Sequence, residues 1–444
     1  MSEPVNKNLG EAPLAHSMRH SDCLYIEIDG GTRRISLEEF TEALNADQNE
    51  LLHEVAWGIP IKDELQSSPA WGMVGNLSAF AAYKAQVGRY LMDANGRAAK
   101  LHRNNSAVFA DGTVLDETKG SVVVIAPALY YLYQEDAESG IPYLWLSQQP
   151  ISKHLLSNAG NGQYIVVGAY KGSIVSGKLV SRSGVDCDTS SKSITGYWNA
   201  AQAFGGNWGL VNVDVWKWIA IMCLCETGGN ANIQANIGQG VGGSAGIAWA
   251  TTNASSVLKK TGKTKGLGDA TGAVAISDSD AQADSTNVSV LGVEDFWGLQ
   301  FEFIQGCYFG SANNQDQDGT EIFLYEGNRL PSAAELAATH PDGEYRKVSP
   351  RPTTSGYVGT MFKGENFDLF AKSLTGGDST SRWCDYFYGN NTGQVLLVGG
   401  ASNYGAFSGP FCVASINAWS YTYSSCGARP AYYGPVTIVD GRDL

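Results

Sequence analysis

The side chains best suited to chemistry in this sequence are aromatic and small polar residues toward its C-terminal end. Between Asp385 and Arg429 the chain contains no Asp, Glu, Lys, Arg or His. Tyrosine and tryptophan rings supply a large contact area at little cost in rotamer entropy, and Ser, Gly and Asn supply adaptable hydrogen bonds. This composition favours a binding surface, and an irregular aromatic-lined loop of a β-rich core is the alternative. The aromatic residues concerned are Tyr404, Phe407, Phe411, Trp419, Tyr421 and Tyr423.

Motifs of the common enzyme classes do not accompany this stretch. The sequence lacks a P-loop, a G-x-G-x-x-G fingerprint after a strand and an H-E-x-x-H zinc motif. None of its six histidines has a serine or cysteine partner in its local context. Asp and Glu are numerous, so a catalytic carboxylate pair stays open, although no spacing singles one out. We therefore expect a binding protein and not an enzyme.

The eight cysteines are scattered and have neither C-x-x-C spacing nor a close histidine. Cys223 and Cys225 point to different faces of a predicted helix, so they do not form a chelating pair. We expect reduced thiols that serve as small apolar side chains, without a zinc or disulfide framework. Residues 313–319, NNQDQDG, are similar to a calcium loop, but the glutamate that ends such loops is missing. We predict a polar hairpin tip there, no metal site and no cofactor.

Composition and charge favour β-structure with many loops. Of 444 residues, 53 are glycine and 17% are charged, and the formal net charge is −14. Without a basic patch, nucleic acid and anionic membranes are not expected as partners. No apolar run reaches the roughly 20 residues of a membrane span, so no membrane insertion is expected. The first residues, MSEPVNKNLG, have neither the basic nor the apolar region of a signal peptide, which predicts folding in a cytoplasm.

Residues 1–80 predict a small module for attachment or oligomerisation, or alternatively a segment that packs onto a larger domain. Residues 23–36 alternate apolar and polar positions around a glycine pair, which predicts a hairpin. A capping box predicts a helix over residues 37–44. A further helix is expected over residues 77–91.

Residues 81–140 predict a β-rich intermediate region. Asn95-Gly96 is the dipeptide of a two-residue hairpin turn. Residues 121–126 form a continuous apolar run, which is typical of a core strand. Aromatic residues in and after this region are expected in the core or in an interface, namely Tyr130, Tyr131, Tyr133, Tyr143 and Trp145.

Residues 141–444 predict the main domain. Its best helix spans 215–227, with Asp214 as N-cap and a glycine pair after its end. The glycine-, alanine- and serine-rich residues 230–287 predict a surface insertion with at most one hairpin. Strands are expected to resume over residues 288–324.

Several short motifs resemble those of one protein family. Toward the end of the chain they are VLLVGG at 395–400, Gly405, SGPF at 408–411, Trp419-Ser420 and GARP at 427–430. They are similar to the end of variable proteins diversified by retroelements, of which the tropism determinants of phage tail fibres are the best known. The resemblance covers roughly residues 85–444 and extends upstream to 216–226, Gln234, 237–241 and 291–306.

This resemblance implies an α+β fold. The fold is a C-type-lectin-like domain, similar to that of formylglycine-generating enzymes, β-rich with few helices and long loops, and preceded by the N-terminal module. The domain would span 141–444 and its variable ligand-binding region 395–433. The motifs with which true C-type lectins bind sugars through calcium, Glu-Pro-Asn and Gln-Pro-Asp, do not occur. Calcium-dependent sugar binding is therefore not implied.

The resemblance also implies which residues vary. In this family, adenines of chosen codons are randomised, and a diversified Asn codon cannot give Trp, Met, Lys, Glu or Gln. From 401 to 426 the only such residue is Trp419, which is therefore expected in the framework together with Arg429. The ligand-binding residues implied by the resemblance are Ala401, Ser402, Asn403, Tyr404, Ala406, Phe407, Cys412, Ser415, Ile416, Asn417, Tyr421, Tyr423, Ser425 and Cys426.

The function implied by the resemblance is that of a receptor-binding protein, or adhesin. Such a protein would be made in the host cytoplasm and carried in the virion, at the tip of a phage tail fibre or baseplate. Its partners would be a bacterial cell-surface receptor, either protein or glycan, and other virion tail proteins. A homo-oligomer, with a trimer favoured, would add avidity to individually weak sites.

Two alternatives from other classes stay open. The first is a purely structural phage tail protein with the same fold and a buried, invariant C-terminal loop. The second is an oxidoreductase similar to formylglycine-generating enzymes, which need a reactive cysteine pair near the corresponding site. Cys412 and Cys426 lie in that region. Exposure of the aromatic residues separates the binding protein from the structural one.

Overall fold

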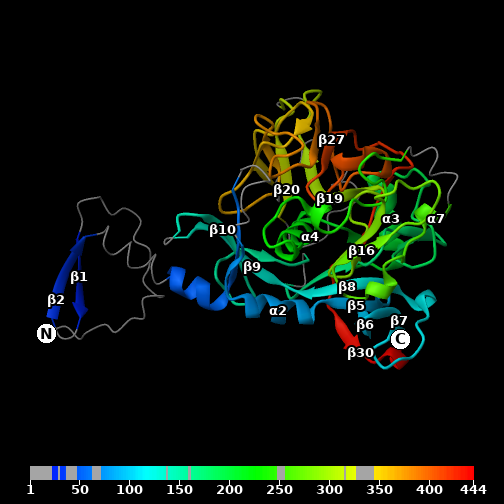
Figure 1. The fold of residues 1–444 in the computed structure, drawn as a ribbon, viewed down its shortest axis with the longest axis horizontal. Helices are drawn as coiled ribbons and strands as arrows, with labels where there is room; N and C mark the ends of the chain where they lie inside the picture. Colours follow the sequence, from blue (N-terminus) through cyan, green and yellow to red (C-terminus); the bar gives the residue numbers. More distant parts are fainter. Residues whose placement is uncertain are drawn as a thin grey trace.

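The computed structural model describes residues 23–28, 31–36, 48–62, 72–136, 139–158, 162–247, 256–314, 317–326 and 345–444. Its regular structure consists mainly of antiparallel β-sheets with few helices. Figure 1 shows two large sheets in the lower and upper parts of the body, with a helix between them. This arrangement confirms the expected β-rich architecture with few helices.

The lower sheet combines strands from distant parts of the sequence. Its strand order is β15-β29-β12-β8-β5-β6-β30, and β7 pairs with β6. The apolar run predicted as a core strand is β8, buried along almost its whole length. Because this sheet contains strands from both sides of residue 140, it crosses the predicted boundary between intermediate region and main domain. The strands are β5 (Gly88–Met92), β6 (Arg97–His102), β7 (Asn105–Phe109), β8 (Ser121–Pro127), β12 (Tyr164–Gly168), β15 (Trp208–Leu210), β29 (Pro430–Tyr432) and β30 (Thr437–Val439).

The upper sheet carries most of the C-terminal part of the chain. Its order is β21-β20-β19-β26-β27-β25-β22, and β28 pairs with β19 in parallel. The nine-residue β19 lies near its centre and is buried throughout. The strands are β19 (Phe301–Phe309), β20 (Ile322–Tyr325), β21 (Tyr345–Val348), β22 (Gly356–Tyr357), β25 (Tyr386–Gly389), β26 (Val395–Val398), β27 (Val413–Asn417) and β28 (Cys426–Gly427).

Smaller sheets surround these two. A five-stranded sheet has the order β11-β9-β10-β3-β4, and it ties β3 and β4 to β9, β10 and β11. The hairpin of β1 and β2 confirms the first predicted hairpin, whereas the helix predicted over 37–44 lies outside the described residues. The strands are β1 (Cys23–Ile28), β2 (Gly31–Ser36), β3 (Trp57–Pro60), β4 (Val74–Gly75), β9 (Leu129–Glu135), β10 (Pro142–Ser147), β11 (Leu155–Leu156), β13 (Ser173–Val175), β14 (Lys178–Val180), β16 (Gly272–Ala275), β17 (Thr286–Val290), β18 (Val293–Glu294), β23 (Thr360–Met361) and β24 (Ala371–Ser373).

The helix predicted over 77–91 is shorter than expected. Helix α2 (Leu77–Gln86) begins at the N-cap Asn76 and ends before Val87, which is extended. The residues after it form β5, because their buried side chains pack in the lower sheet and their backbone pairs with β8. The other helices are α3 (Ile194–Phe204), α4 (Val213–Glu226), α5 (Ile233–Asn236) and α7 (Ser256–Lys259), residues 48–55 are also helical, and the 3-10 turns are η2 (Glu117–Lys119), η3 (Lys265–Leu267), η4 (Ser402–Phe407) and η5 (Gly441–Asp443).

Helix α4 is the centre of the body. Its residues from Val215 to Cys225 are all buried, as expected for a helix that packs on every side. It packs against β11, β12, β17 and β19. The prediction that Asp214 is the N-cap is wrong: the Asn212 side chain accepts a hydrogen bond from the Val215 backbone N–H at 3.0 Å. Asp214 instead lies in the first turn.

The glycine-rich residues 230–287 are more than a surface insertion. In their described part, β16 and β17 form the single expected hairpin. However, Val241, Ile247 and Leu258 are buried and form a small core with Cys187 and Leu299. This segment therefore contributes to the packing of the body.

Two further expectations concern metals and membranes. Of the predicted tip at 313–319, residues 315–316 lie outside the described part; Asp318 accepts hydrogen bonds from Thr320. In the described ranges no three acidic, histidine or cysteine side chains are arranged to hold a metal ion. Among the helices of these ranges, none combines the length and apolar character needed to cross a bilayer.

Candidate ligand-binding surface

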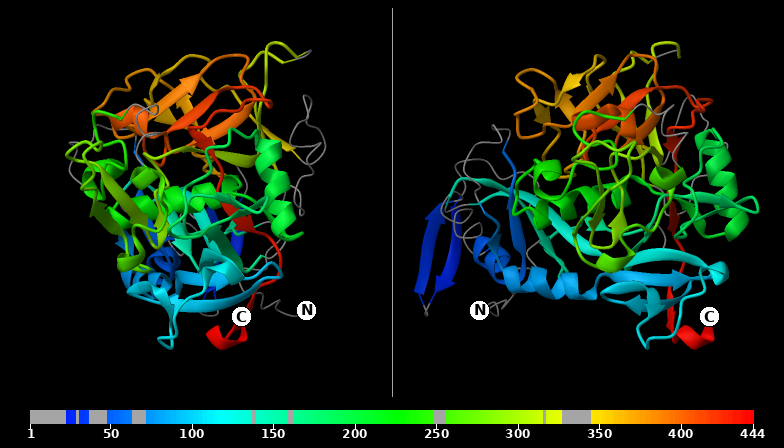
Figure 2. Two further views of the ribbon diagram at one scale, coloured as in Figure 1. Left: turned by 90° about the vertical axis from the view of Figure 1, so that its right-hand side faces the viewer. Right: turned by 45° about the vertical axis from the view of Figure 1, so that its right-hand side comes forward.

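The predicted variable region, 395–433, starts with β26 of the upper sheet and ends with β29 of the lower sheet. The segment considered first is its part between β26 and the end of β27, at the end of the molecule opposite the lower sheet (Figure 1). Figures 1 and 2 show β27 and its neighbours in the upper part of the body and β5, β6 and β8 in the lower part. The segment begins after β26, whose four residues are buried, and returns through β27, with η4 between them. Gly399 and Gly400 join β26 to η4 with φ of 88° and 75°, a backbone region that favours glycine.

A glycine-rich stretch, 240–247, supports η4 from below. The Ile247 N–H donates to the Ser402 carbonyl at 2.7 Å, and the Ala406 N–H donates to the Ser244 carbonyl at 3.0 Å. A Cβ on Gly242 would lie 2.3 Å from the Ser402 carbonyl oxygen, so only glycine allows this approach. The backbone of η4 is therefore held by main-chain contacts that do not depend on its own side chains.

Asp385 holds the turn after η4. Its carboxylate accepts hydrogen bonds from the Phe411 N–H at 2.7 Å and from the Gln234 side chain at 2.6 Å. Gln234 also donates to the Ser408 carbonyl, and Trp216 of α4 donates to the Pro410 carbonyl at 2.9 Å. Burial raises the pKa of Asp385 to about 6, although these hydrogen bonds lower it.

Arg429 lies beneath the segment in a fully buried ionic group. Its guanidinium pairs with Glu302 at 2.8 Å, and Lys171 pairs with the same carboxylate at 2.8 Å. Burial alone would raise the pKa of Glu302, but the charges of Arg429 and Lys171 outweigh burial and lower it. Arg429 also donates to the carbonyls of Gly168 and Glu294, so it ties β12, β19 and the final strands together. Arg429, predicted as a framework residue, is thus fully buried.

Trp419 is half-buried at the start of the loop that follows β27. Its ring stacks on that of Tyr308 from β19, with centroids 5.7 Å apart and planes 10° apart. The Trp419 N–H lies 3.4 Å from the side-chain oxygen of Gln394. Trp419 thus anchors the loop to the upper sheet, in keeping with its predicted framework role.

The fourteen predicted ligand-binding residues divide into two groups. Six are buried and have little or no side-chain surface for a ligand; they are Ala401, Ser402, Cys412, Ser415, Ser425 and Cys426. Ser415, for example, accepts a hydrogen bond from the buried Arg351 guanidinium at 3.1 Å. The other eight are exposed or half-buried: Asn403, Tyr404, Ala406, Phe407, Ile416, Asn417, Tyr421 and Tyr423.

The exposed aromatic residues of the segment do not act alone. The Phe407 ring, 37% exposed, lies 4.7 Å from the ring of Tyr386 and 5.6 Å from that of Tyr357. The ring centroids of Tyr404 and Tyr388 lie 5.1 Å apart. We call Tyr357, Tyr386, Tyr388, Tyr404 and Phe407 the aromatic patch.

Sequence reasoning missed three members of the aromatic patch. Tyr386 and Tyr388 are half-buried and alternate with the buried Phe387 in β25, and Tyr357 of β22 is the register partner of Tyr386. The alternation in the sequence YFYG is the period-two signal that could have placed both tyrosines on one face. Burial raises the pKa of Tyr357, Tyr388 and Tyr404.

A second pair of rings lies in the loop after Trp419. Tyr421 and Tyr423 are stacked, with centroids 6.4 Å apart and planes 19° apart. Tyr423 is 52% exposed, whereas Tyr421 is half-buried and its pKa is raised by burial. We call Tyr421 and Tyr423 the tyrosine pair. Its outer ring is open to solvent and offers a contact area for a partner.

The two cysteines of the segment, Cys412 and Cys426, are not activated as nucleophiles. Burial raises the pKa of Cys412 well above its usual range and that of Cys426 to about 12, so both thiols stay protonated. Residues 242–246, GGSAG, have the spacing G-x-S-x-G of a nucleophilic serine, at Ser244. A nucleophile elbow places its serine between a strand and a helix, whereas Ser244 lies in a turn beside η4. In the described part of the chain no histidine is hydrogen-bonded to it.

Comparisons with known proteins do not place the chain in a family. No protein-family model matches it, and no curated protein matches it. The chain is a β-rich protein in which an aromatic segment without charged residues, 386–428, lies on a framework of buried ion pairs and main-chain contacts.

Proposed function

We propose that this chain is a receptor-binding protein, or adhesin, whose aromatic patch and tyrosine pair contact a bacterial cell-surface receptor. The observation that carries this proposal is the division within residues 401–426. Aromatic and small polar side chains point outward, and the residues that hold the backbone lie beneath them. Such a surface tolerates substitution because its support comes from elsewhere in the chain.

The finer proposals rest on the sequence resemblance. They are a C-type-lectin-like fold, diversification by a retroelement, and a place at the tip of a phage tail fibre or baseplate in a homo-oligomer. The glycine-rich support of η4 and the buried Arg429 agree with a fixed framework under a variable surface. Preorganised rings lower the conformational cost of binding, and oligomerisation would add avidity.

The alternatives receive less support. In a purely structural tail protein the C-terminal loop would be covered, but Tyr423, Phe407 and Ile416 are exposed in this chain. An oxidoreductase similar to formylglycine-generating enzymes would need a reactive thiolate, and the buried Cys412 and Cys426 have raised pKa values.

The direct experiment is a cell-binding assay with the purified, fluorescently labelled protein on a panel of bacterial cells. The double variant Tyr421→Ala, Tyr423→Ala is expected to bind at least about tenfold more weakly, because exposed aromatic anchors dominate binding energy. The matched control is Ile438→Ala, a residue 54% exposed on β30 in the lower part of the molecule. Equal binding by wild type and the double variant, on cells that bind wild type, would contradict the proposal.

A genetic experiment tests diversification separately. The 3′ end of the gene is sequenced across one population, and the flanking DNA is searched for a near-copy of codons 395–430. Substitutions confined to adenine-containing codons between 401 and 426, with Trp419 unchanged, are expected. A uniform sequence without a template copy would favour a fixed adhesin or a structural tail protein.

A further inference from the structure

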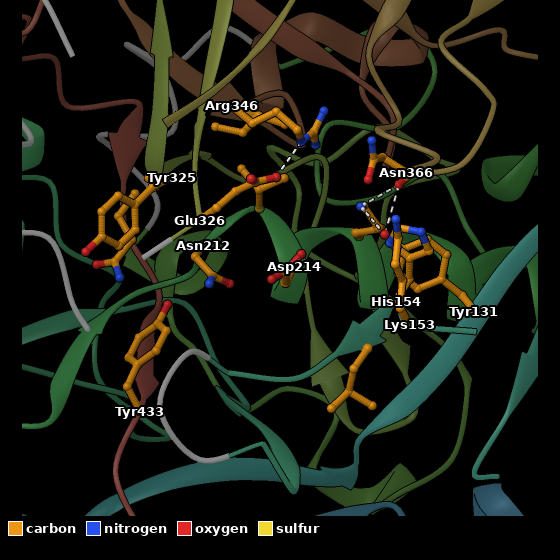
Figure 3. Close-up of a pocket in the computed structure, with 16 residues that line it drawn as sticks. Tyr131, Lys153, His154, Asn212, Asp214, Tyr325, Glu326, Arg346, Asn366 and Tyr433 are labelled. Carbon is orange, nitrogen blue, oxygen red and sulfur yellow. Dashed lines mark hydrogen bonds and ion pairs between the residues drawn. The ribbon is translucent and has the colours of Figure 1, made fainter. Parts of the chain in front are cut away.

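A cavity of about 410 Å³ opens beside the N-terminal end of α4, and none of the fourteen predicted site residues lines it. It is built from α4, β9, β11, β19, β20, β21 and the residues near Asn366. Its volume falls in the range of roughly 300–1,000 Å³ that is typical of small-molecule sites. In Figure 3, Asp214 and Asn212 lie at its centre, Tyr325 and Tyr433 on one side, and Tyr131 and His154 on the other.

The charges that line this cavity are nearly balanced. Arg346 is neutralised by ion pairs with Glu326 and Asp368, and Lys153 pairs with Glu365. The lining also holds one acidic side chain, Asp214, and one basic side chain, Lys217, and burial raises the pKa of Asp214. The cavity therefore has no strong preference for a cation or an anion.

Asp214 is the group that points to a ligand. It lies in the first turn of α4 and lines the cavity. Within the described ranges, its carboxylate has no hydrogen bond and no ion pair with a side chain of the protein. Lys217, one turn further along, is 3% exposed; its ammonium donates to the Asn366 carbonyl at 3.0 Å and lies 5.0 Å from the centre of the Tyr131 ring. The nearest buried cation is thus engaged, while the carboxylate keeps its acceptors free.

The polar groups around Asp214 complement it. The Asn212 side-chain oxygen caps α4, which leaves the amide N–H groups of the same side chain as donors beside the carboxylate. A hydroxyl group can donate to a carboxylate and accept from an amide at the same time. The tyrosine rings on both sides add apolar area for the C–H faces of such a molecule.

We propose that this cavity binds an uncharged polyhydroxylated ligand, the size of a monosaccharide or the terminal sugar of a glycan, with Asp214 as its principal hydrogen-bond acceptor. An uncharged ligand fits this lining, because Asp214 and Lys217 are of opposite sign and a charge on the ligand would gain from one of them and lose to the other. This second site is distinct in residues from the aromatic patch and the tyrosine pair, and it does not depend on the proposed function.

The test is saturation-transfer NMR on the full chain with five neutral sugars: D-glucose, D-galactose, D-mannose, L-rhamnose and N-acetyl-D-glucosamine. At least one is expected to bind with a Kd on the order of 1 mM, as suits a ligand of this size. Glucuronate, glucosamine, glycine and inorganic phosphate are the charged comparisons. Absence of binding by all five neutral sugars, or stronger binding by any charged probe, would overturn the proposal.

Two variants locate the site. Asp214→Ala and Tyr325→Ala are each expected to weaken sugar binding at least about tenfold, with Asp111→Ala, an exposed carboxylate outside the cavity, as the control. Unfolding midpoints check that both variants stay folded. If the Asp214 variant does not fold, the Tyr325 variant still tests the site. Unchanged binding in both folded variants would overturn the assignment. The double variant of Tyr421 and Tyr423 should bind sugar normally, which separates this result from the cell-binding assay.

Discussion

The two candidate binding regions of this protein are built in opposite ways. Apart from Tyr357, the aromatic patch and the tyrosine pair come from one stretch, 386–428, which contains no Asp, Glu, Lys, Arg or His. The cavity beside α4 draws its charged side chains from several distant segments. On the surface, side chains face outward and main-chain contacts hold the backbone. In the cavity, ion pairs with neighbouring carboxylates hold the charged side chains Arg346 and Lys153.

This difference teaches which region can change its sequence. A substitution at Asn403 or Tyr423 removes an outward group and leaves the contacts beneath intact. A substitution at Arg346 would leave Glu326 and Asp368 without their cation. We therefore expect the surface to tolerate variation and the cavity to resist it.

The largest expected effect comes from the framework beneath the surface. Glu302→Gln leaves both Lys171 and Arg429 buried without a carboxylate, which should lower the free energy of unfolding by roughly 3–5 kcal/mol. Urea unfolding at pH 7 measures this change. Glu365→Gln, in an exposed ion pair, is the control and should leave the midpoint unchanged. Equal stability of the Glu302 variant and wild type would show that the surface does not depend on this buried group.

The next largest effect is a pH dependence of stability that comes from Asp385, the carboxylate beneath the turn 408–411. Burial raises the pKa of Asp385 from its usual 3.8 to about 6, so the folded protein keeps a proton there that the unfolded chain releases. Unfolding therefore releases protons between these values, and stability falls as pH rises from about 4 to 6, by up to roughly 3 kcal/mol. Asp385→Asn removes this contribution.

The measurement is urea unfolding of wild type and Asp385→Asn at pH 4, 5, 6 and 7. The free energy of unfolding of the variant relative to that of wild type should rise from pH 4 to 6 and stay constant from pH 6 to 7. Asp378→Asn is the control, because hydrogen bonds from Thr380 lower the pKa of Asp378 below 3.8 and its stability relative to wild type should therefore change little between pH 4 and 7. A difference between wild type and the Asp385 variant that does not change with pH would contradict the raised pKa.

A smaller effect is expected within the aromatic patch. Phe407→Ala removes a ring that contacts both Tyr386 and Tyr357, so receptor binding on cells should weaken by roughly 1–2 kcal/mol. Tyr386→Ala should weaken binding as well, although it lies outside the predicted variable residues. If only the Phe407 variant loses binding, the patch ends at the variable segment and β25 serves as support alone.

The smallest effect is that of salt. Because the surface carries no charged side chain from 386–428, its affinity for cells should change by less than about twofold between 0.05 and 0.5 M NaCl. Binding of the labelled protein over this range of ionic strength measures it. A steep loss of binding with salt would assign recognition to a charged region of the molecule and not to the aromatic patch.

Local sequence signals determined a large part of the architecture. The apolar run 121–126 became the buried strand β8, and the alternation over 23–36 became the hairpin of β1 and β2. Helix α4 followed from its apolar composition and the glycines after its end. The charge-free stretch marked the region of the candidate surface, because a lack of ionisable residues is visible without coordinates.

Tertiary structure decided what these local signals left open. Helix α4 begins at Val213, two residues earlier than an N-cap at Asp214 would allow, so Asn212 is the N-cap and Asp214 lies in the first turn, where it lines the cavity. Helix α2 stopped at Gln86 because the residues after it pair with β8.

The same holds for the two binding regions. Small residues such as Ser402 and Ser415 suit both a surface and a core, and only the packing of 240–247 and Arg351 against them made them part of the framework. Tyr386 joined the aromatic patch because β25 pairs in parallel with β27. The cavity brings together residues between 131 and 433. Such groupings depend on long-range pairing, whereas composition and periodicity report only on neighbours along the chain.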